Sequence, residues 1–124
     1  MESLLIEATK HSPRVELLPT GVINIEGRSI VEDSIMFFEP ILKWIKGCSS
    51  QSLNIDIKLE YINTSSSKQL FNMLKIIHGN FPASNVQVKW YYEEGDEDTL
   101  ELGKEFESET MLPFVFLQFS GTAA

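Results

Sequence analysis

The segment from Asn63 to Lys68 reads Asn-Thr-Ser-Ser-Ser-Lys and presents four consecutive hydroxyl side chains. A hydroxyl can accept a phosphoryl group, which adds a charge of about −1.5 to −2 and three acceptor oxygens. A serine can also act as a nucleophile, and the spacing of Ser65 and Lys68 matches the S-x-x-K motif of penicillin-binding proteins and class A β-lactamases. These hydroxyls therefore suit covalent modification or, with the lysine as base, acyl transfer.

A third role for the same residues is structural. Asn, Thr and Ser favour the N-cap of a helix, where a side-chain oxygen accepts a hydrogen bond from a free backbone N–H. A helix start is also electropositive and receives added negative charge well. Four hydroxyls exceed what one cap needs, which leaves room for a modified side chain or an anion site. The S-D-N and K-T-G partner motifs of the serine enzymes are absent, and the chain is short for their fold, so the enzymatic interpretation is the weakest.

A strand leads into this segment and a helix leads out of it. From Leu53 to Tyr61 apolar and polar residues alternate, which is the period of a strand with one buried face. From about Ser65 to Asn80 apolar residues recur at helical spacing, and Phe71 and Leu74 are expected to face the sheet. The buried strand positions are Leu53, Ile55, Ile57, Leu59 and Tyr61, and the helical stripe is Leu70, Phe71, Leu74, Ile77, His78 and Phe81.

The other elements follow from the same signals. Residues 3–8 form a short edge strand, and strands at 14–18 and 22–26 flank the hairpin turn Pro19-Thr20-Gly21. Further strands are predicted at 85–92 and 113–119, a third helix at 96–109, and a loose tail at 120–124. The inner face of the third helix is expected to carry Leu100, Gly103 and Phe106.

The first helix is predicted to begin at a cap of Asp33 or Ser34 and to end near Gly47. Pro40 lies inside it, and a proline there removes one helical hydrogen bond and clashes with the preceding turn. The helix therefore bends at Pro40, or a short first turn ends there and the main helix restarts. Its buried stripe is expected to be Ile35, Phe38, Ile41, Leu42 and Ile45.

The order of elements predicts an α/β domain with a mixed, mostly parallel sheet. Strands separated by helices should be parallel, whereas the N-terminal hairpin should be antiparallel. Central strands of a sheet covered on both faces are apolar throughout, but those at 53–61 and 85–92 alternate. We therefore expect two layers, with the helices on one face only. The other face should present Asp56, Lys58, Glu60, Gln87, Lys89 and Tyr91.

Composition narrows the classes of partner. The chain has 124 residues, 43% hydrophobic and 23% charged, with a net charge of −8, and we expect one domain over residues 1–124. The negative charge argues against nucleic acid and against anionic membrane surfaces. No apolar stretch approaches the ~20 residues of a membrane span, and the N-terminus lacks the features of a signal peptide. Cys48 is the only cysteine, which fits a cytoplasmic protein.

No metal or cofactor site is predicted. The acidic run from Glu93 to Glu101 does not have the ligand spacing of an EF-hand loop, and acids in the first turn of a helix favour its dipole. His11 and His78 are far apart and lack acidic or cysteine partners at ligand spacing. A glycine-rich phosphate loop is also absent.

Four stretches of the chain, in matching order, point to one known family. They are Ile6-Glu7-Ala8-Thr9 with Ser12-Pro13; Phe38-Glu39-Pro40 with Trp44; Leu59 to Lys68; and Trp90-Tyr91-Tyr92 with Glu97-Asp98, Gly103, Glu105-Phe106 and Leu112-Pro113-Phe114. On these residues the chain resembles the SiaC family of bacterial regulatory phosphoproteins. It departs from the family at Arg28 to Asp33, where members often carry a Tyr-Pro-Glu-Asn type of segment, and a changed helix start is expected there.

The resemblance implies a fold similar to STAS domains, the fold of anti-sigma-factor antagonists, and a role in partner switching rather than catalysis. In this family a cognate kinase phosphorylates the threonine that corresponds to Thr64, and a PP2C-type phosphatase removes the phosphate. The unmodified form binds a downstream target, which in one branch is a diguanylate cyclase. Thr64 is expected at or before the N-cap, where its hydroxyl is most exposed. The partner-binding residues are then Asn63, Thr64, Ser65, Ser66 and Lys68.

Two other functions stay open from the residues alone. One is an unmodified protein-binding module in which the hydroxyls serve only as a helix cap. The other is an enzyme that uses Ser65 as nucleophile and Lys68 as base. Phosphopeptide mapping separates the first from a phosphoprotein, and labelling with an acylating probe tests the second.

Overall fold

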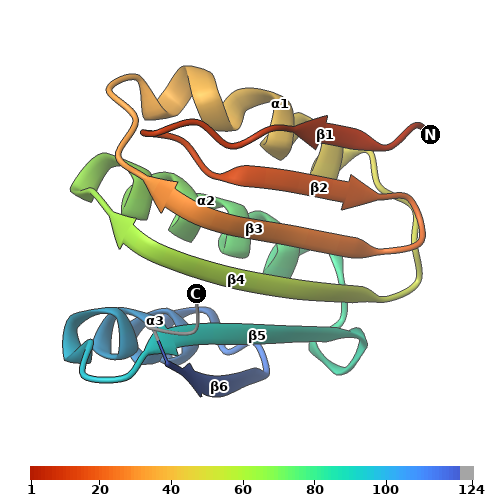
Figure 1. Ribbon diagram of the computed structural model, residues 1–124. Coiled ribbons are helices and arrows are strands. Elements are labelled where there is room, and N and C mark those ends of the chain that lie inside the picture. The colour runs from red at the N-terminus through yellow and green to blue at the C-terminus, as the bar shows by residue number, and fades with distance from the viewer. Residues whose placement is uncertain (121–124) are drawn as a thin grey trace.

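The computed structural model describes residues 1–120, in which six strands and three α-helices follow one another along the chain (Figure 1). The strands are β1 (Leu4–Ile6), β2 (Arg14–Leu18), β3 (Val22–Ser29), β4 (Leu53–Ile62), β5 (Val86–Glu93) and β6 (Phe114–Phe119). The helices are α1 (Ser34–Lys46), α2 (Thr64–Asn80) and α3 (Glu97–Thr110), with a short 3-10 turn η1 (Ala83–Asn85) before β5. Most of the tail predicted at 120–124 lies outside the described residues.

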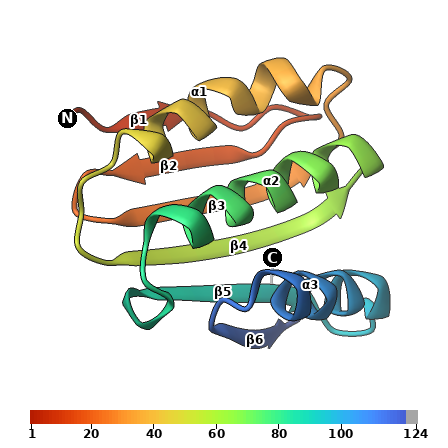
Figure 2. The ribbon, with the colours of Figure 1, turned by 180° about the vertical axis from the view of Figure 1, so that it is seen from behind.

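The six strands form one sheet whose spatial order, β1-β2-β3-β4-β5-β6, is also their order in the chain. The pairs β1–β2 and β2–β3 are antiparallel, and each later pair is parallel. Seen from behind in Figure 2, all three helices lie over the same face of the sheet. The predicted two-layer arrangement, with an antiparallel hairpin and helices on one face, is confirmed.

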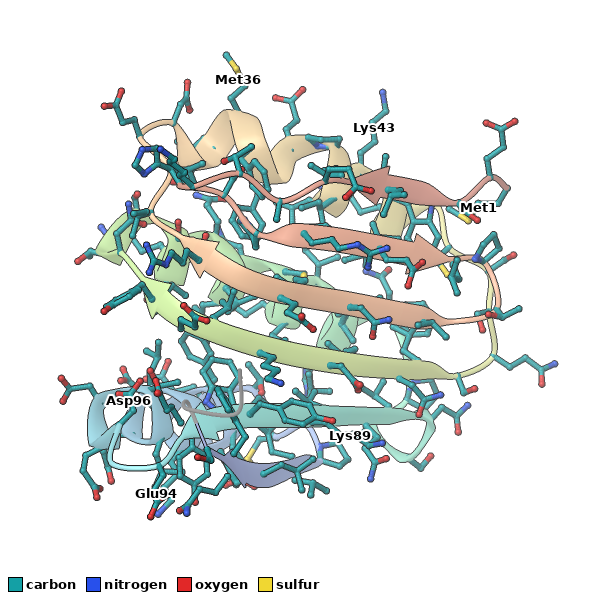
Figure 3. All side chains as sticks on the ribbon, viewed as in Figure 1. Met1, Met36, Lys43, Lys89, Glu94 and Asp96 are labelled. Atoms are coloured by element: carbon teal, nitrogen blue, oxygen red, sulfur yellow. The ribbon has the colours of Figure 1, made fainter. Side chains whose placement is uncertain are left out.

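Alternation along the strands divides the sheet into a core face and an open face. Leu53, Ile55, Ile57 and Leu59 of β4 are buried beneath the helices, whereas the residues between them are at least partly exposed. On β5, Val88 and Trp90 are buried and Lys89 lies on the open face, as Figure 3 shows. The open face therefore presents a largely polar surface opposite the helices, as expected from the period of 2.

Helix α1 decides between the two outcomes predicted at Pro40 and corrects the placement of one residue. It runs without interruption from Ser34 to Lys46, so Pro40 does not split it into two helices. Its N-cap is Asp33, whose Oδ1 accepts a hydrogen bond from Met36 N at 3.0 Å. The buried residues Ser34, Phe38, Ile41 and Ile45 define the inner face, so the placement of Ile35 in the buried stripe is wrong. Ile35 is rotated by about 100° from the buried Ser34 around the helix axis, and its side chain is 67% exposed.

A register shift near the end of β4 overturns the predicted position of Tyr61. Gly27 pairs with Leu59, but the next residue of β3, Arg28, pairs with Tyr61 and leaves Glu60 as the extra residue. Such a bulge reverses the faces to which the following side chains point. Tyr61 is therefore 59% exposed, and Ile62 packs against the core in its place.

Helix α3 packs on β5 through a glycine and an indole ring. Trp90 Nε1 donates a hydrogen bond to the carbonyl oxygen of Thr99 at 2.9 Å, and the Phe106 ring stacks edge-on against Trp90 at 5.6 Å. Gly103 and Phe106 are buried as predicted, whereas Leu100 is only half-buried and Leu102 packs against the core.

Candidate functional site

The hydroxyl segment forms the first turn of α2, and its geometry is set by Asn63. Asn63 is the N-cap, and its Oδ1 accepts a hydrogen bond from Ser66 N at 2.9 Å. Its Nδ2 donates to the carbonyl of Val31 at 3.0 Å, and its backbone N donates to that of Ser29 at 2.9 Å. These bonds tie the start of α2 to the end of β3 and to the residues just beyond it.

Thr64 is the first residue of α2 and is exposed. The prediction that it lies at or before the N-cap is wrong, because the amide of Asn63 takes the capping position. The residue itself is exposed at the first turn of the helix. Within residues 1–120, no hydrogen-bond partner occupies the N–H groups of Thr64 and Ser65, which face the start of the helix.

The three hydroxyls that follow differ strongly in exposure, although the sequence presents them as equivalent. Ser65 is half-buried, with its Oγ 3.4 Å from Asn63 Oδ1. Ser66 is fully buried, and its Oγ has no hydrogen-bond partner among the described residues. Ser67 is half-buried and Lys68 is exposed. Of the four hydroxyls, Thr64 is therefore the one most accessible to another protein.

The geometry gives little support to a serine nucleophile. In the described part of the chain no hydrogen bond joins Ser65 to Lys68, and the contact of the Ser65 hydroxyl is with an amide oxygen. An activated serine needs a base within hydrogen-bonding reach. Ser66, which also precedes a hydroxyl and a lysine, is inaccessible.

Thr64 lies on an open groove of about 1150 Å³ between the start of α2, the carboxyl ends of β3, β4 and β5, and the loop into α3. Asn63, Thr64 and Ser67 line this groove, whereas Ser65, Ser66 and Lys68 do not. The charged residues along its walls are Arg28, Lys58, Glu26, Glu60, Glu93, Glu94, Asp96 and Asp98. Figure 3 shows Glu94 and Asp96 at the end of β5, beside α3.

Most wall residues of this groove are not among the site residues predicted from the sequence, and four of them lie close together. Arg28 Nε lies 3.4 Å from Glu60 Oε2, and the guanidinium carbon lies 5.2 Å from the centre of the Tyr61 ring. Alternation along β4 predicts Glu60 on the open face and Tyr61 in the core, whereas the bulge exposes Tyr61 and pairs it with Arg28. Lys58 lies nearby, with its Nζ 4.6 Å from the centre of the Phe119 ring. The alternation of apolar and polar residues along β4 continues through Tyr61 and therefore does not predict the bulge.

Residues 1–120 contain neither a candidate metal cluster nor a helix that could span a membrane. His, Cys, Asp and Glu side chains do not gather there in a group of three or more that could hold a metal ion. The helices of this region are also too short or too polar to span a bilayer.

Comparison with known proteins identifies relatives of this chain in sequence and in structure. Residues 6–119 match the SiaC family regulatory phosphoprotein profile. A protein of Pseudomonas aeruginosa (strain UCBPP-PA14) is 27% identical over 119 residues, covering 92% of this chain and 94% of that protein. Among solved structures, SiaC of Pseudomonas aeruginosa superimposes with a TM-score of 0.82 at 27% identity, covering 96% of this chain and all of the other.

A second solved structure contains SiaC with a partner. It is the diguanylate cyclase SiaD of Pseudomonas aeruginosa in complex with its activator SiaC, with a TM-score of 0.80, 27% identity, and coverage of 94% of this chain and 99% of that one. Because the family profile spans nearly the whole chain and the fold agrees with these structures, this protein belongs to the SiaC family of regulatory phosphoproteins.

Proposed function

We propose that this protein is a phosphorylation-controlled partner switch whose modified residue is Thr64. In the unmodified state it binds and activates a diguanylate cyclase, and phosphorylation of Thr64 by a cognate kinase ends that binding. A PP2C-type phosphatase restores the binding state. The observation that carries the proposal is the exposed Thr64 hydroxyl at the first turn of α2, on the wall of the groove, in a chain of the SiaC family.

The surroundings of Thr64 make a phosphate tolerable to the protein itself. The N–H groups of Thr64 and Ser65 are available to phosphate oxygens, and the helix start favours negative charge. Arg28 and Lys58 line the same groove, but six carboxylates do so as well. A phosphate therefore adds about two negative charges to an acidic wall, which alters the surface that a partner meets.

The neighbours of Thr64 have distinct roles in this proposal. Asn63 holds the turn that presents the hydroxyl, and the buried Ser66 fixes the turn against the core. Ser65 and Lys68 border Thr64 and contact the partner. The chain itself is a ligand and a kinase substrate rather than an enzyme, and it works in the cytoplasm, where the cyclase and kinase find their nucleotides.

The test installs phosphothreonine directly at position 64 by genetic code expansion, which avoids the need to know the kinase. Each diguanylate cyclase encoded in the same genome is titrated with the unmodified chain by calorimetry, and its cyclic dinucleotide output is measured. The matched control carries phosphothreonine at Thr20, an exposed residue in the β2–β3 turn at the other end of the sheet.

One cyclase is expected to bind and respond to the unmodified chain, to Thr64→Ala and to the control, and to lose at least about tenfold in affinity for the chain modified at Thr64. Thr64→Glu is expected to weaken binding less, since a carboxylate lacks the full charge and the three oxygens of a phosphate. Equal binding by both phosphorylated chains contradicts the switch. Phosphopeptides from the native host that map elsewhere contradict the choice of Thr64.

A further inference from the structure

The net charge of the chain is confined to one segment. Residues 93–110 hold nine of the eighteen acidic residues and one of the ten basic residues, so they carry a formal charge of −8. The remaining residues hold nine of each sign and are neutral overall. The segment comprises the end of β5, the turn and all of α3, where Glu101, Glu105 and Glu109 are exposed four residues apart.

Strand β6 lies beside this segment and forms one edge of the sheet. Val88 N donates to the carbonyl of Pro113 at 2.9 Å, and Glu94 N donates to that of Phe119 at 2.8 Å. These two bonds set the phase of the ladder, in which alternate residues of a strand point their N–H and C=O groups to the same neighbour. The backbone groups of Phe114, Phe116 and Gln118 therefore point outward, and no described residue pairs with them.

Between Phe114 and Phe119 the strand itself has none of the usual protection against edge pairing. Natural edge strands are often guarded by lysine, proline or a bulge, but β6 reads Phe-Val-Phe-Leu-Gln-Phe and pairs with β5 without a register shift. Val115 is 40% exposed on the open face, and Leu117 and Phe119 follow it at the strand period. An extended segment laid along this edge can form backbone hydrogen bonds and cover apolar side chains.

Charge decides between the possible occupants of the edge. If two copies paired through β6 about a two-fold axis normal to the sheet, the helices of both would lie on the same face, with the two α3 helices as neighbours. Each α3 region carries −8, so pairing of two copies is opposed by repulsion. A partner segment rich in Lys and Arg is attracted instead, because its cations lie against the exposed carboxylates of α3.

We propose that the β6 edge is a docking site for an extended basic segment of a partner protein, which adds to the sheet as a seventh strand. Its backbone pairs with Phe114, Phe116 and Gln118, its apolar side chains cover Val115 and Leu117, and its cations face α3. Phe119, at the end of β6, also lines the groove that contains Thr64. A segment bound here leads toward the modified residue, but its binding does not depend on whether Thr64 is phosphorylated.

The probe is a fluorescent octapeptide of alternating lysine and valine, titrated against the full chain by anisotropy, with amide chemical shifts mapped by NMR. Two controls are an acidic peptide of alternating glutamate and valine, and the lysine peptide N-methylated at alternate amides. Gln118→Pro removes an outward N–H from the edge while leaving the bonds to β5, and Gln118→Ala keeps that N–H. The triple variant Glu101→Gln, Glu105→Gln, Glu109→Gln removes charge from α3, and its matched control is Glu2→Gln, Glu7→Gln, Glu39→Gln.

The lysine peptide is expected to shift the amides of residues 114–118 and to lose at least about tenfold in affinity on N-methylation, with Gln118→Pro, and with the α3 triple variant. Gln118→Ala and the control triple are expected to stay within about twofold. The proposal is overturned by absence of binding, by equal binding of the N-methylated peptide, or by equal losses in both triple variants. Self-association through β6 in sedimentation at low ionic strength also overturns it, in favour of a second copy.

Discussion

The Trp90 indole lies where a side chain on Gly103 would have to be: an ideal Cβ at Gly103 falls 2.5 Å from Trp90 Nε1. That nitrogen is held by its hydrogen bond to the Thr99 carbonyl, and the ring is 1% exposed. The ring can therefore shift only by disturbing its hydrogen bond and its packing, and the close approach of α3 to β5 at this point favours a glycine.

Gly103→Ala is expected to destabilise the protein by about 1–3 kcal/mol, because the extra methyl group overpacks this contact. Gly79→Ala is the matched control. It also lies in a helix, its added Cβ would meet nothing within 4 Å, and a gain of about 0.5–1 kcal/mol in stability is expected there. Urea unfolding followed by tryptophan fluorescence measures both, and a stabilising Gly103→Ala would contradict the packing.

Asn63→Ala is expected to cost about 0.5–2 kcal/mol, since it removes the cap of α2 and leaves Ser66 N and the Val31 carbonyl without their partner. Thr64→Ala is the comparison at the next residue. Its side chain caps nothing, so its free energy of unfolding should stay within about 0.5 kcal/mol of wild type. Thermal unfolding of both variants compares the two losses of stability. A larger loss for Thr64→Ala than for Asn63→Ala would mean that Thr64 is the cap.

Leu74→Ala and Phe71→Ala, both placed against the sheet from sequence, are expected to differ. Leu74 is fully buried, so its truncation should cost about 2–5 kcal/mol. Phe71 is half-buried, with its ring 5.5 Å from that of Phe106 on α3, and truncation should cost less than Leu74→Ala. Denaturant melts rank the two, and the reverse order would mean that α2 is rotated relative to this structure.

Met111 ends α3 in the left-handed conformation, with φ of 61°, although it is not glycine. Met111→Gly relieves this conformation and is expected to stabilise the protein by roughly 0.5–1 kcal/mol, because the side chain is 73% exposed and contributes little packing. Met36→Gly makes the same change at an exposed position inside α1, where a loss of about 1 kcal/mol is expected. Calorimetric melting of the pair should therefore show shifts of opposite sign.

The layers of the fold could be read from the sequence because alternation and helical spacing report burial directly. From Leu53 to Leu59 every second residue is buried as predicted. The pattern fails at Tyr61, where one extra residue turns the chain over, and a bulge in one strand depends on the register of its neighbour. It also fails at Ile35, since an apolar residue on the outer face of a helix has the same chemistry as one on the inner face.

The candidate site was only partly predictable for a related reason. The segment 63–68 was recognised from its residue types, but these do not say which hydroxyl is exposed, and Ser66 is fully buried while Thr64 is not. Arg28 and Glu60 come together across two strands that are distant in sequence. The pairing of β3 with β4 brings these two residues together, and the spacing of residues within either strand does not predict that pairing.

The strands lie in the sheet in the same order as in the chain, and this has a consequence for folding during synthesis. As the polypeptide leaves the ribosome, each new strand finds its neighbour already present, and every pairing closes over the shortest available stretch of chain. Until residues 114–119 emerge, β5 is the edge strand of the sheet. Val88 and Trp90 then lack their pairing partners on β6. Before the last strand pairs, the unpaired backbone groups of β5 are therefore open to pairing with another chain, which a chaperone would prevent.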